Sequence, residues 1–311
     1  MNVRIGYSIV LVLLSAHSLL GQQDAQYTQY MYNTVSVNPA YAGSRGYFSL
    51  TGLYRSQWAG FDGAPETQTL TMNTPVAKNV GLGVSIVNDK IGPSNETYLF
   101  ADFAYSLRLN QDFQLNLGLK AGGSLLDVDF SRLEGVDVDP KFQNNIDNRF
   151  SPNIGVGFYV HSDKAYVGLS VPNLLETKHF DEGIFVEGEA VSLLAEERAN
   201  LYLIGGYVFD VNYFTKVKPT ILVKTVQGAP LQVDLSVNVL FSEKFRAGLA
   251  YRWGNALSGL VGFQLNDSLL IGYAYDAELS TLGGSNSGSH EFFIRFELFR
   301  STGNSLSPRF F

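Results

Sequence analysis

Apolar and polar residues alternate one by one along much of this chain, in stretches of about ten residues separated by polar breaks. From Phe113 to Leu119 every second residue is apolar, whereas Gln114 and Asn116 take the other parity. A period of two is typical of a β-strand with two different faces, because successive side chains of a strand point to opposite sides. The pattern therefore predicts a chain built from strands.

About fourteen strands can be placed, which is within the even-numbered range of bacterial outer-membrane barrels. Their predicted spans are 46–58, 66–74, 80–88, 96–109, 112–125, 152–161, 165–172, 198–210, 217–227, 231–241, 244–253, 257–265, 268–277 and 289–300. Breaks after even-numbered strands are short, whereas breaks after odd-numbered strands include 126–151 and 173–197. This asymmetry is typical of a transmembrane barrel with short periplasmic turns. The even strand number then predicts that both termini lie in the periplasm.

Charged residues support a lipid-facing outer surface, because Lys or Arg facing lipid at the midplane costs about 2–4 kcal/mol. In the last predicted strand Phe292 and Ile294 share the outer parity, and Glu291 and Arg295 share the inner one. The same inner parity is predicted for Arg55, Asp102, Arg108, Lys120, Lys224, Asp234, Arg246, Arg252 and Glu297. A soluble all-β protein is the alternative, since its strands also alternate. We predict an all-β fold, a transmembrane antiparallel β-barrel of about 14 strands with an N-terminal plug-like segment.

The N-terminal region differs from the barrel pattern. Residues 5–20 are mainly apolar, follow Arg4 and are interrupted by His17, so they are too short for the ~20 residues of a membrane-spanning helix. They are typical of a signal peptide. The predicted organisation is a signal peptide at 1–21, a periplasmic lead-in or plug at 22–45, an outer-membrane β-barrel at 46–300 and a periplasmic C-terminal tail at 301–311.

Composition narrows the chemistry of the chain. It has 311 residues, a net charge of -7 and no cysteine, which excludes disulfides and thiolate chemistry. The acidic residues are concentrated in 126–151 and 173–197, and a nucleic-acid partner is disfavoured because phosphate binding needs a basic surface. Asp127 with Asp129, and Asp137 with Asp139, offer oxygens for calcium, but their spacing is not that of the calcium-binding loop signature. Solvated acidic loops are the other interpretation.

No catalytic constellation is evident. His161, His179 and His290 follow the predicted signal peptide, and they lie in separate parts of the predicted barrel. A shared pocket for acid–base chemistry is therefore not predicted, although a Ser-His-Asp triad in the barrel wall is the alternative, because such triads are defined by geometry. We predict a non-enzymatic protein without cofactor or metal.

Glycine pairs inside the strands resemble phosphate-binding loops only superficially. Gly81 and Gly83, and likewise Gly155 and Gly157, lie at period two within predicted strands. A phosphate cradle requires a strand-to-helix turn, which is not predicted at either pair. Close packing between strands is therefore the preferred interpretation.

The segment 24–43, DAQYTQYMYNTVSVNPAYAG, precedes the first strand. Its high content of tyrosine argues against disorder, since disordered segments are poor in aromatic residues. We predict that it packs as a plug in the periplasmic mouth of the barrel. The candidate plug residues are Tyr27, Tyr30, Tyr32, Asn38, Pro39 and Tyr41.

Several segments in order along the chain resemble one known family. They are 26–46 (QYTQYMYNTVSVNPAYAGSRG), 55–70 (RSQWAGFDGAPETQTL), 79–93 (NVGLGVSIVNDKIGP), 166–175 (YVGLSVPNLL), 218–235 (KPTILVKTVQGAPLQVDL), 289–296 (SHEFFIRF) and the terminal SPRFF. Together they are similar to the PorP/SprF family of type IX secretion outer-membrane proteins. The resemblance covers 23–311.

The resemblance implies an outer-membrane barrel that accompanies the type IX secretion and gliding apparatus and docks or anchors a secreted surface adhesin through its C-terminal domain. Implied partners are that adhesin, other outer-membrane or periplasmic type IX secretion components such as a peptidoglycan-binding protein, and the surrounding membrane lipid. A passive outer-membrane channel or porin is the alternative function, which the barrel pattern and the mixed charges of the predicted lumen support.

The loop 173–197 is the predicted docking surface. Loops longer than about 12–15 residues without regular structure are usually functional or disordered. Apolar residues must supply the holding energy, because electrostatics sets encounter rate and selectivity more than affinity. The candidate partner-binding residues are Leu174, Leu175, Phe180, Ile184, Phe185 and Val186. The alternative is that they only pack the loop onto the barrel mouth.

Overall fold

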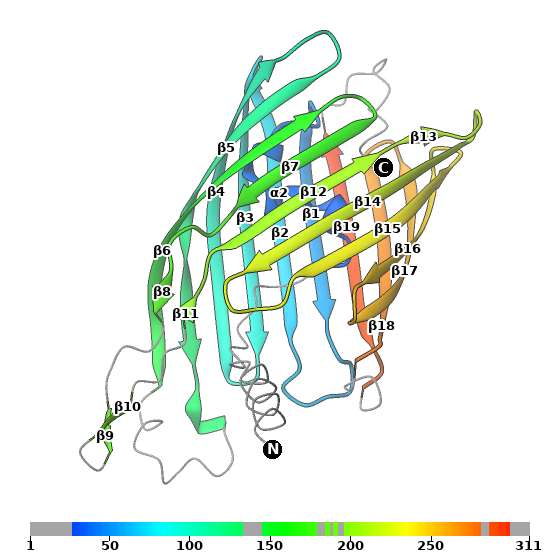
Figure 1. Cartoon of the computed structure of the whole chain (residues 1–311). Coiled ribbons are helices and arrows are strands. Elements are labelled where there is room, and N and C mark those ends of the chain that lie inside the picture. Colours follow the sequence, from blue (N-terminus) through cyan, green and yellow to red (C-terminus); the bar gives the residue numbers. More distant parts are fainter. Residues whose placement is uncertain are drawn as a thin grey trace, which may run out of the picture.

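The chain forms one closed antiparallel barrel in its computed structural model, which describes residues 27–132, 145–178, 184–186, 189–191, 196–280 and 286–298, with side chains described outside 177–197 (Figure 1). The barrel strands are β1 (Phe48–Ser56), β2 (Glu66–Ala77), β3 (Val80–Ile91), β4 (Ser94–Arg108), β5 (Gln114–Val128), β6 (Ile146–His161), β7 (Ala165–Val171), β12 (Asn200–Tyr207), β13 (Phe209–Asp210), β14 (Thr215–Val226), β15 (Gln232–Phe241), β16 (Phe245–Arg252), β17 (Ala256–Asn266), β18 (Leu269–Glu278) and β19 (Ser289–Leu298).

Strand pairing closes the sheet on itself. β1 pairs with β19, with Phe48 opposite Leu298, and β12 pairs with both β7 and β14. The two-residue β13 continues β12 along β14, so the described residues form 14 strands around the barrel. Because the sheet is closed, no barrel strand that the structure describes is left as an edge with unpaired backbone N–H and C=O groups, as a sheet in lipid requires. The predicted all-β antiparallel barrel of about 14 strands is confirmed.

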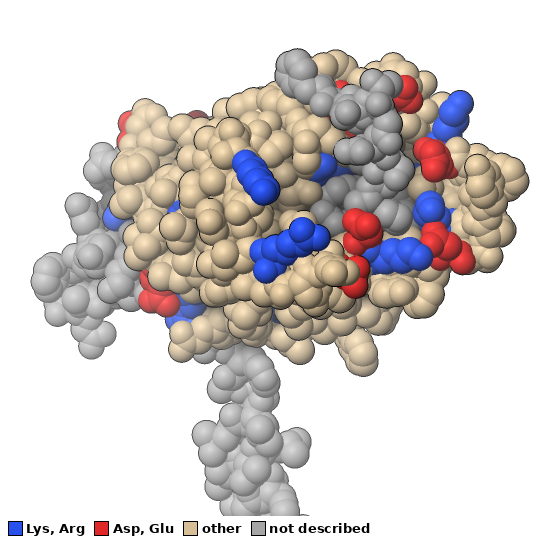
Figure 2. Space-filling model, turned by 90° about the horizontal axis from the view of Figure 1, so that it is seen from above, with Lys and Arg blue, Asp and Glu red and all other residues tan. Residues whose placement is uncertain are grey.

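The two rims differ as predicted, with two exceptions. We call the rim with the turns 78–79, 109–113, 162–164, 211–214, 242–244 and 267–268 the short-turn rim, which is uppermost in Figure 1, and the opposite one the long-loop rim. The long-loop rim also contains two tight hairpins, at 92–93 and 253–255, because Gly92 and Gly254 adopt positive φ angles of 55° and 72°. Figure 2 looks onto the short-turn rim and shows acidic and basic residues scattered among uncharged ones.

Side-chain parity divides a lipid-type outer surface from a polar lumen. On β19, Phe292 and Ile294 are 53% and 51% exposed on the outside, whereas Glu291 and Arg295 are buried inside. The predicted inner parity is confirmed around the barrel, and Arg108 lies exposed where β4 ends at the short-turn rim. Among the described residues, no helix has the length and apolarity needed to cross a membrane.

The predicted long loops are partly structured. β5 continues to Val128 and β6 begins at Ile146, so the first loop is shorter than predicted, and it opens with the 3₁₀ helix η3 (Phe130–Arg132). Within 173–197, β8 (Thr177–Lys178) pairs with β11 (Glu196–Glu197), and β9 (Ile184–Val186) pairs with β10 (Glu189–Val191).

Residues 27–47, here called the luminal segment, lie inside the barrel and provide much of its core (Figure 1). They contain three short helical turns, η1 (Tyr30–Tyr32), α2 (Thr34–Val37) and η2 (Pro39–Tyr41). Asn38 caps η2, because its side-chain oxygen accepts a hydrogen bond from the Ala40 N–H at 3.0 Å, and Pro39 begins that turn with a φ suited to it.

Candidate functional site in the barrel lumen

The luminal segment runs along the lumen rather than across one mouth. Near its start, the Gln29 N–H donates to Glu291 at 2.8 Å, and near its end Arg45 forms an ion pair with Glu297. Both carboxylates belong to β19, where six positions correspond to about 20 Å. The segment therefore extends from the long-loop half of the lumen to the short-turn rim. The sequence had indicated the periplasmic mouth alone, and the segment reaches much deeper.

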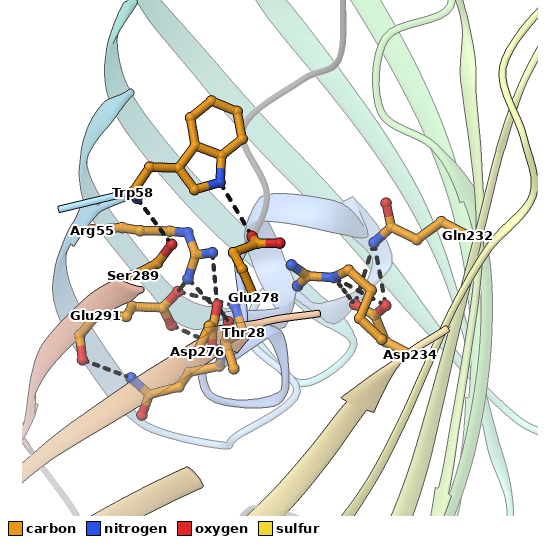
Figure 3. A network of polar contacts seen from close by, with 11 residues as sticks. Thr28, Arg55, Trp58, Gln232, Asp234, Asp276, Glu278, Ser289 and Glu291 are labelled. Atoms are coloured by element: carbon orange, nitrogen blue, oxygen red, sulfur yellow. Dashed lines mark hydrogen bonds and ion pairs between the residues drawn. The ribbon is translucent and has the colours of Figure 1, made fainter. Parts of the chain in front are cut away.

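A buried ion cluster holds the start of the segment (Figure 3). Arg55 of β1 contacts Asp276 of β18 at 2.7 Å and Glu291 of β19 at 3.1 Å. Thr28 donates its backbone N–H to Glu291 at 2.9 Å and its hydroxyl to Asp276 at 2.6 Å. Both carboxylates are paired with Arg55 and also accept hydrogen bonds, which offsets part of the cost of their burial. Three strands and the segment are thereby joined at one point.

The middle of the segment lies on a row of lumen-facing glycines, here called the glycine track: Gly81 of β3, Gly118 of β5, Gly157 of β6 and Gly168 of β7. A Cβ atom at Gly118 would lie 2.1 Å from the Ala40 nitrogen, and one at Gly157 would lie 2.2 Å from Asn38 Oδ1. Such distances are impossible, so only glycine permits this close approach of backbone to wall. For Gly81 and Gly157, the predicted strand packing is therefore replaced by packing against the luminal segment.

Hydrogen bonds between the segment and three strands, β5, β6 and β7, hold the segment on the glycine track. Asn38 is fully buried and donates its amide to the Phe158 carbonyl at 3.0 Å. The Ser170 hydroxyl donates to the Val37 carbonyl at 2.7 Å, and the Asn116 amide donates to the Ala40 carbonyl at 3.0 Å. The structure places all the predicted plug residues in the lumen, namely Tyr27, Tyr30, Tyr32, Asn38, Pro39 and Tyr41, and all are buried.

Tyr32 lies among cations in the half of the lumen toward the short-turn rim. Its ring stacks on Phe293 with centroids 4.9 Å apart. Lys218 Nζ, Arg246 Cζ and Arg295 Cζ lie 5.9, 6.0 and 5.7 Å from the centre of the Tyr32 ring. Such distances correspond to cation–π contacts. Parity predicted that Arg246 and Arg295 face inward, but their convergence on Tyr32 could not be derived from it.

The predicted partner-binding residues are only partly described. Leu174 and Leu175 are 43% and 40% exposed at the long-loop rim. Asn153 of β6 holds them, because its side-chain oxygen accepts both of their N–H groups at 3.0 Å and its amide donates to the Leu175 carbonyl. Ile184, Phe185 and Val186 form β9, but their side chains lie outside the described residues, as does the whole of Phe180.

The acidic residues considered for calcium are used by the protein itself. Asp127 accepts the Asn148 N–H at 2.7 Å, and Asp129 accepts the Ser131 hydroxyl at 2.6 Å. The Ser131 hydroxyl is also the main reason why the pKa of Asp129 lies below its ordinary value. Within the described part of the chain, no three His, Asp or Glu residues are grouped to hold a metal ion. Asp137 and Asp139 lie outside the described residues.

Comparison with known proteins agrees with this architecture. The family model described as "Type IX secretion system membrane protein PorP/SprF" matches residues 19–296. No curated protein matches the chain. The structure titled "CymD monoaromatic hydrocarbon channel" is similar with a TM-score of 0.50 and 13% identity over 88% of this chain and 94% of that one. The Acinetobacter baumannii outer membrane protein Omp33 gives a TM-score of 0.48 and 8% identity over 81% and 97%.

The match to the family model extends over most of the chain and includes both the luminal segment and nearly all of β19. The similarity to the CymD structure shows the fold alone, which is that of an outer-membrane barrel. This chain is a member of the PorP/SprF family of type IX secretion system membrane proteins.

Proposed function

We propose that this barrel is a non-enzymatic docking unit of the type IX secretion and gliding apparatus, which anchors a secreted adhesin at the cell surface through the C-terminal domain of that adhesin. Membership of the PorP/SprF family supports a role in secretion. The observation that carries the docking role is the filled lumen, because a barrel occupied by residues 27–47 is poorly suited to passing solutes. Further partners would be periplasmic or outer-membrane secretion components, such as a peptidoglycan-binding protein.

Within this proposal the luminal segment acts as a plug. It contacts opposite walls of the lumen, since Tyr30 reaches Thr220 of β14 at 3.0 Å while Thr71 of β2 donates to Asn33 at 2.7 Å. Aromatic pairs such as Tyr32 with Phe293 contribute about 0.5–1.5 kcal/mol each beyond their buried area. These contacts offset part of the entropy lost when the segment is ordered.

The orientation of the barrel follows from its rims. Short turns face the periplasm in outer-membrane barrels, and longer loops face outward. This supports a periplasmic position for Phe48 and Leu298, the paired ends of the barrel. It does not support one for Tyr27, whose hydroxyl is 2.9 Å from Thr69 in the long-loop half of the lumen. The periplasmic position of both termini stays a prediction, because residues 1–26 and 299–311 lie outside the described residues.

The docking surface proposed is the loop after β7 at the long-loop rim. The side chains of Leu174 and Leu175 are exposed there, while Asn153 fixes their backbone by hydrogen bonds. Both side chains are therefore held at the surface of the rim. A preorganised apolar contact loses less entropy on binding than a mobile one. The nearby acidic residues would direct a basic partner to this rim.

The test is loss of the apolar side chains. We expect that replacing Phe180, Ile184 and Phe185 together by serine, or Leu174 and Leu175 together by serine, releases the adhesin from intact cells into the medium. The matched control is Leu231→Ser, because Leu231 is 61% exposed in another turn of the same rim. Wild-type retention by both multiple variants, with normal insertion of the barrel, would remove this loop from the docking site.

A further inference from the structure

Four buried cations share the half of the lumen nearest the short-turn rim. They are Arg45, Lys218, Arg246 and Arg295, and we call them the basic cluster. Glu297 compensates Arg45 through their ion pair. Among the described residues, no carboxylate lies within the 4.0 Å of an ion pair of Arg246 or Arg295, although these side chains are only 6% and 1% exposed. The cluster therefore carries an excess of buried positive charge.

Unused hydrogen-bond donors accompany this charge. Arg246 Nε and Nη1 and Arg295 Nη1 are buried and have no hydrogen-bond partner among the residues that the structure describes. The remaining bonds of these groups are Arg246 Nη2 to the Gln264 side chain at 3.3 Å, Arg295 Nε to the Thr51 hydroxyl at 3.4 Å, and Arg295 Nη2 to the Tyr32 carbonyl. A buried donor without an acceptor destabilises the folded protein, and more so when it is charged. Natural proteins seldom leave such groups uncompensated.

We propose that the basic cluster is the binding site of one small oxyanion of the phosphate or sulfate type, held between Arg246 and Arg295 beside Tyr32. A guanidinium offers two parallel N–H groups that match the oxygens of such an anion. Lys218 Nζ lies at the same ring and offers a further N–H donor. The bound anion neutralises the excess charge and thereby stabilises the luminal segment where Tyr32 is held. This inference does not depend on which protein docks at the opposite rim.

Access to the site is from the short-turn rim. Gln264 of β17 lies next to Arg246 and near the turn 267–268 of this rim, and its side chain is only partly buried. It is held by the 3.3 Å bond from Arg246 and by its own 2.8 Å bond to the Asn266 carbonyl. The anion can be a free ion or the phosphate of a lipid headgroup, which share the same chemistry.

The test is a titration of the purified full-length barrel in detergent with inorganic phosphate, followed by calorimetry and by thermal unfolding, with potassium chloride at equal ionic strength as the reference. We expect saturable binding of one phosphate and a higher unfolding temperature. In the variant Arg246→Gln with Arg295→Gln, binding should weaken about tenfold or more. Arg108→Gln is the matched control, because Arg108 is an exposed arginine at the same rim, and it should bind like wild type.

Three outcomes decide the proposal. No saturable phosphate binding by the wild type, together with no phospholipid retained in mass spectra of the barrel released from phosphatidylglycerol nanodiscs, overturns it. Equal binding by the double glutamine variant shows an adventitious ion only and also overturns it. Retained phospholipid that is lost in the double variant supports the site with a lipid headgroup as the source. If the double variant does not insert into the membrane, Arg246→Lys is used instead, because it keeps the positive charge but loses the two parallel N–H groups of the guanidinium. Unchanged phosphate binding by Arg246→Lys overturns the proposal.

Discussion

The carboxylate of Glu291 accepts the backbone N–H of Gln29 at 2.8 Å, although the two residues are 262 positions apart in the chain. One residue belongs to the last strand and the other to the segment before the first. The contact places the start of the luminal segment in the long-loop half of the barrel, while Arg45 and Glu297 hold its end at the short-turn rim. The lumen is thus lined by wall residues and filled by the chain's own N-terminal region.

Arg55 is expected to be the most sensitive residue of the ion cluster. Arg55→Met leaves Asp276 and Glu291 buried without their cation, and breaking a buried pair in this way destabilises a protein by roughly 3–5 kcal/mol. Urea unfolding of the refolded barrel should show this loss. The control is Lys216→Met, which removes a partly exposed ion pair with Asp210. Equal stability of Arg55→Met and wild type would show that the cluster does not hold the barrel together.

The glycine track predicts a sharp effect of one methyl group. Gly118→Ala places a Cβ atom 2.1 Å from the Ala40 nitrogen, so the luminal segment must move away from β5. We expect higher single-channel conductance in planar bilayers. The electrophoretic mobility of the barrel should still change on boiling, as it does for a folded barrel. Gly259→Ala is the matched control, because a Cβ atom there meets nothing within 4 Å. If both variants conduct like wild type, the track does not position the segment.

Deletion tests the plug as a whole. Removing 24–41 takes away the tyrosines that fill the lumen together with Asn38 and Pro39. We expect a large rise in conductance and passage of small sugars into liposomes. Conductance that stays at the wild-type level would contradict the plug but not the barrel. Free passage of sugars through the wild type would instead favour the channel function.

Much of the fold follows from the sequence because side-chain parity is a local property. Alternation placed the strands, and the parity of Glu291 and Arg295 assigned them to the lumen before any pairing was known. The tight turn at Gly92 was not predicted, although Gly92 is followed by Pro93. The strands β3 and β4 extend beyond the alternating apolar residues from which their ends were predicted.

The site was harder to predict, because its contacts join distant parts of the chain. Nothing near Arg55 indicates that its partners are Asp276 and Glu291, since that choice depends on the register of strands far apart in sequence. Likewise, Gly118 is required by the backbone of Ala40, and a glycine within a strand does not reveal what approaches it. The tyrosine content of residues 24–43 predicts a packed segment, but its depth in the lumen depends on the contact between Gln29 and Glu291, which the sequence does not reveal.

The loop after β5 should respond to acid. The Ser131 hydroxyl lowers the pKa of the Asp129 carboxyl, so the contribution of Asp129 to loop stability is present above the ordinary pKa and is lost as the pH falls through the lowered one. A carbon-detected NMR titration should therefore give Asp129 a midpoint below the ordinary value of about 3.9. Ser131→Ala should raise that midpoint, and an unchanged midpoint would assign the shift to another cause.

The most direct test of the docking function compares the surface proteins of a deletion strain with those of the complemented strain, by biotin labelling of intact cells and mass spectrometry. We predict that one or a few secreted adhesins disappear from the surface and accumulate in the medium, while membrane integrity and uptake of small solutes remain near normal. A filled lumen and exposed apolar residues such as Leu174 at the long-loop rim lead to this expectation. An unchanged set of surface proteins, together with reduced uptake of small solutes, would contradict the docking function and identify the barrel as a channel.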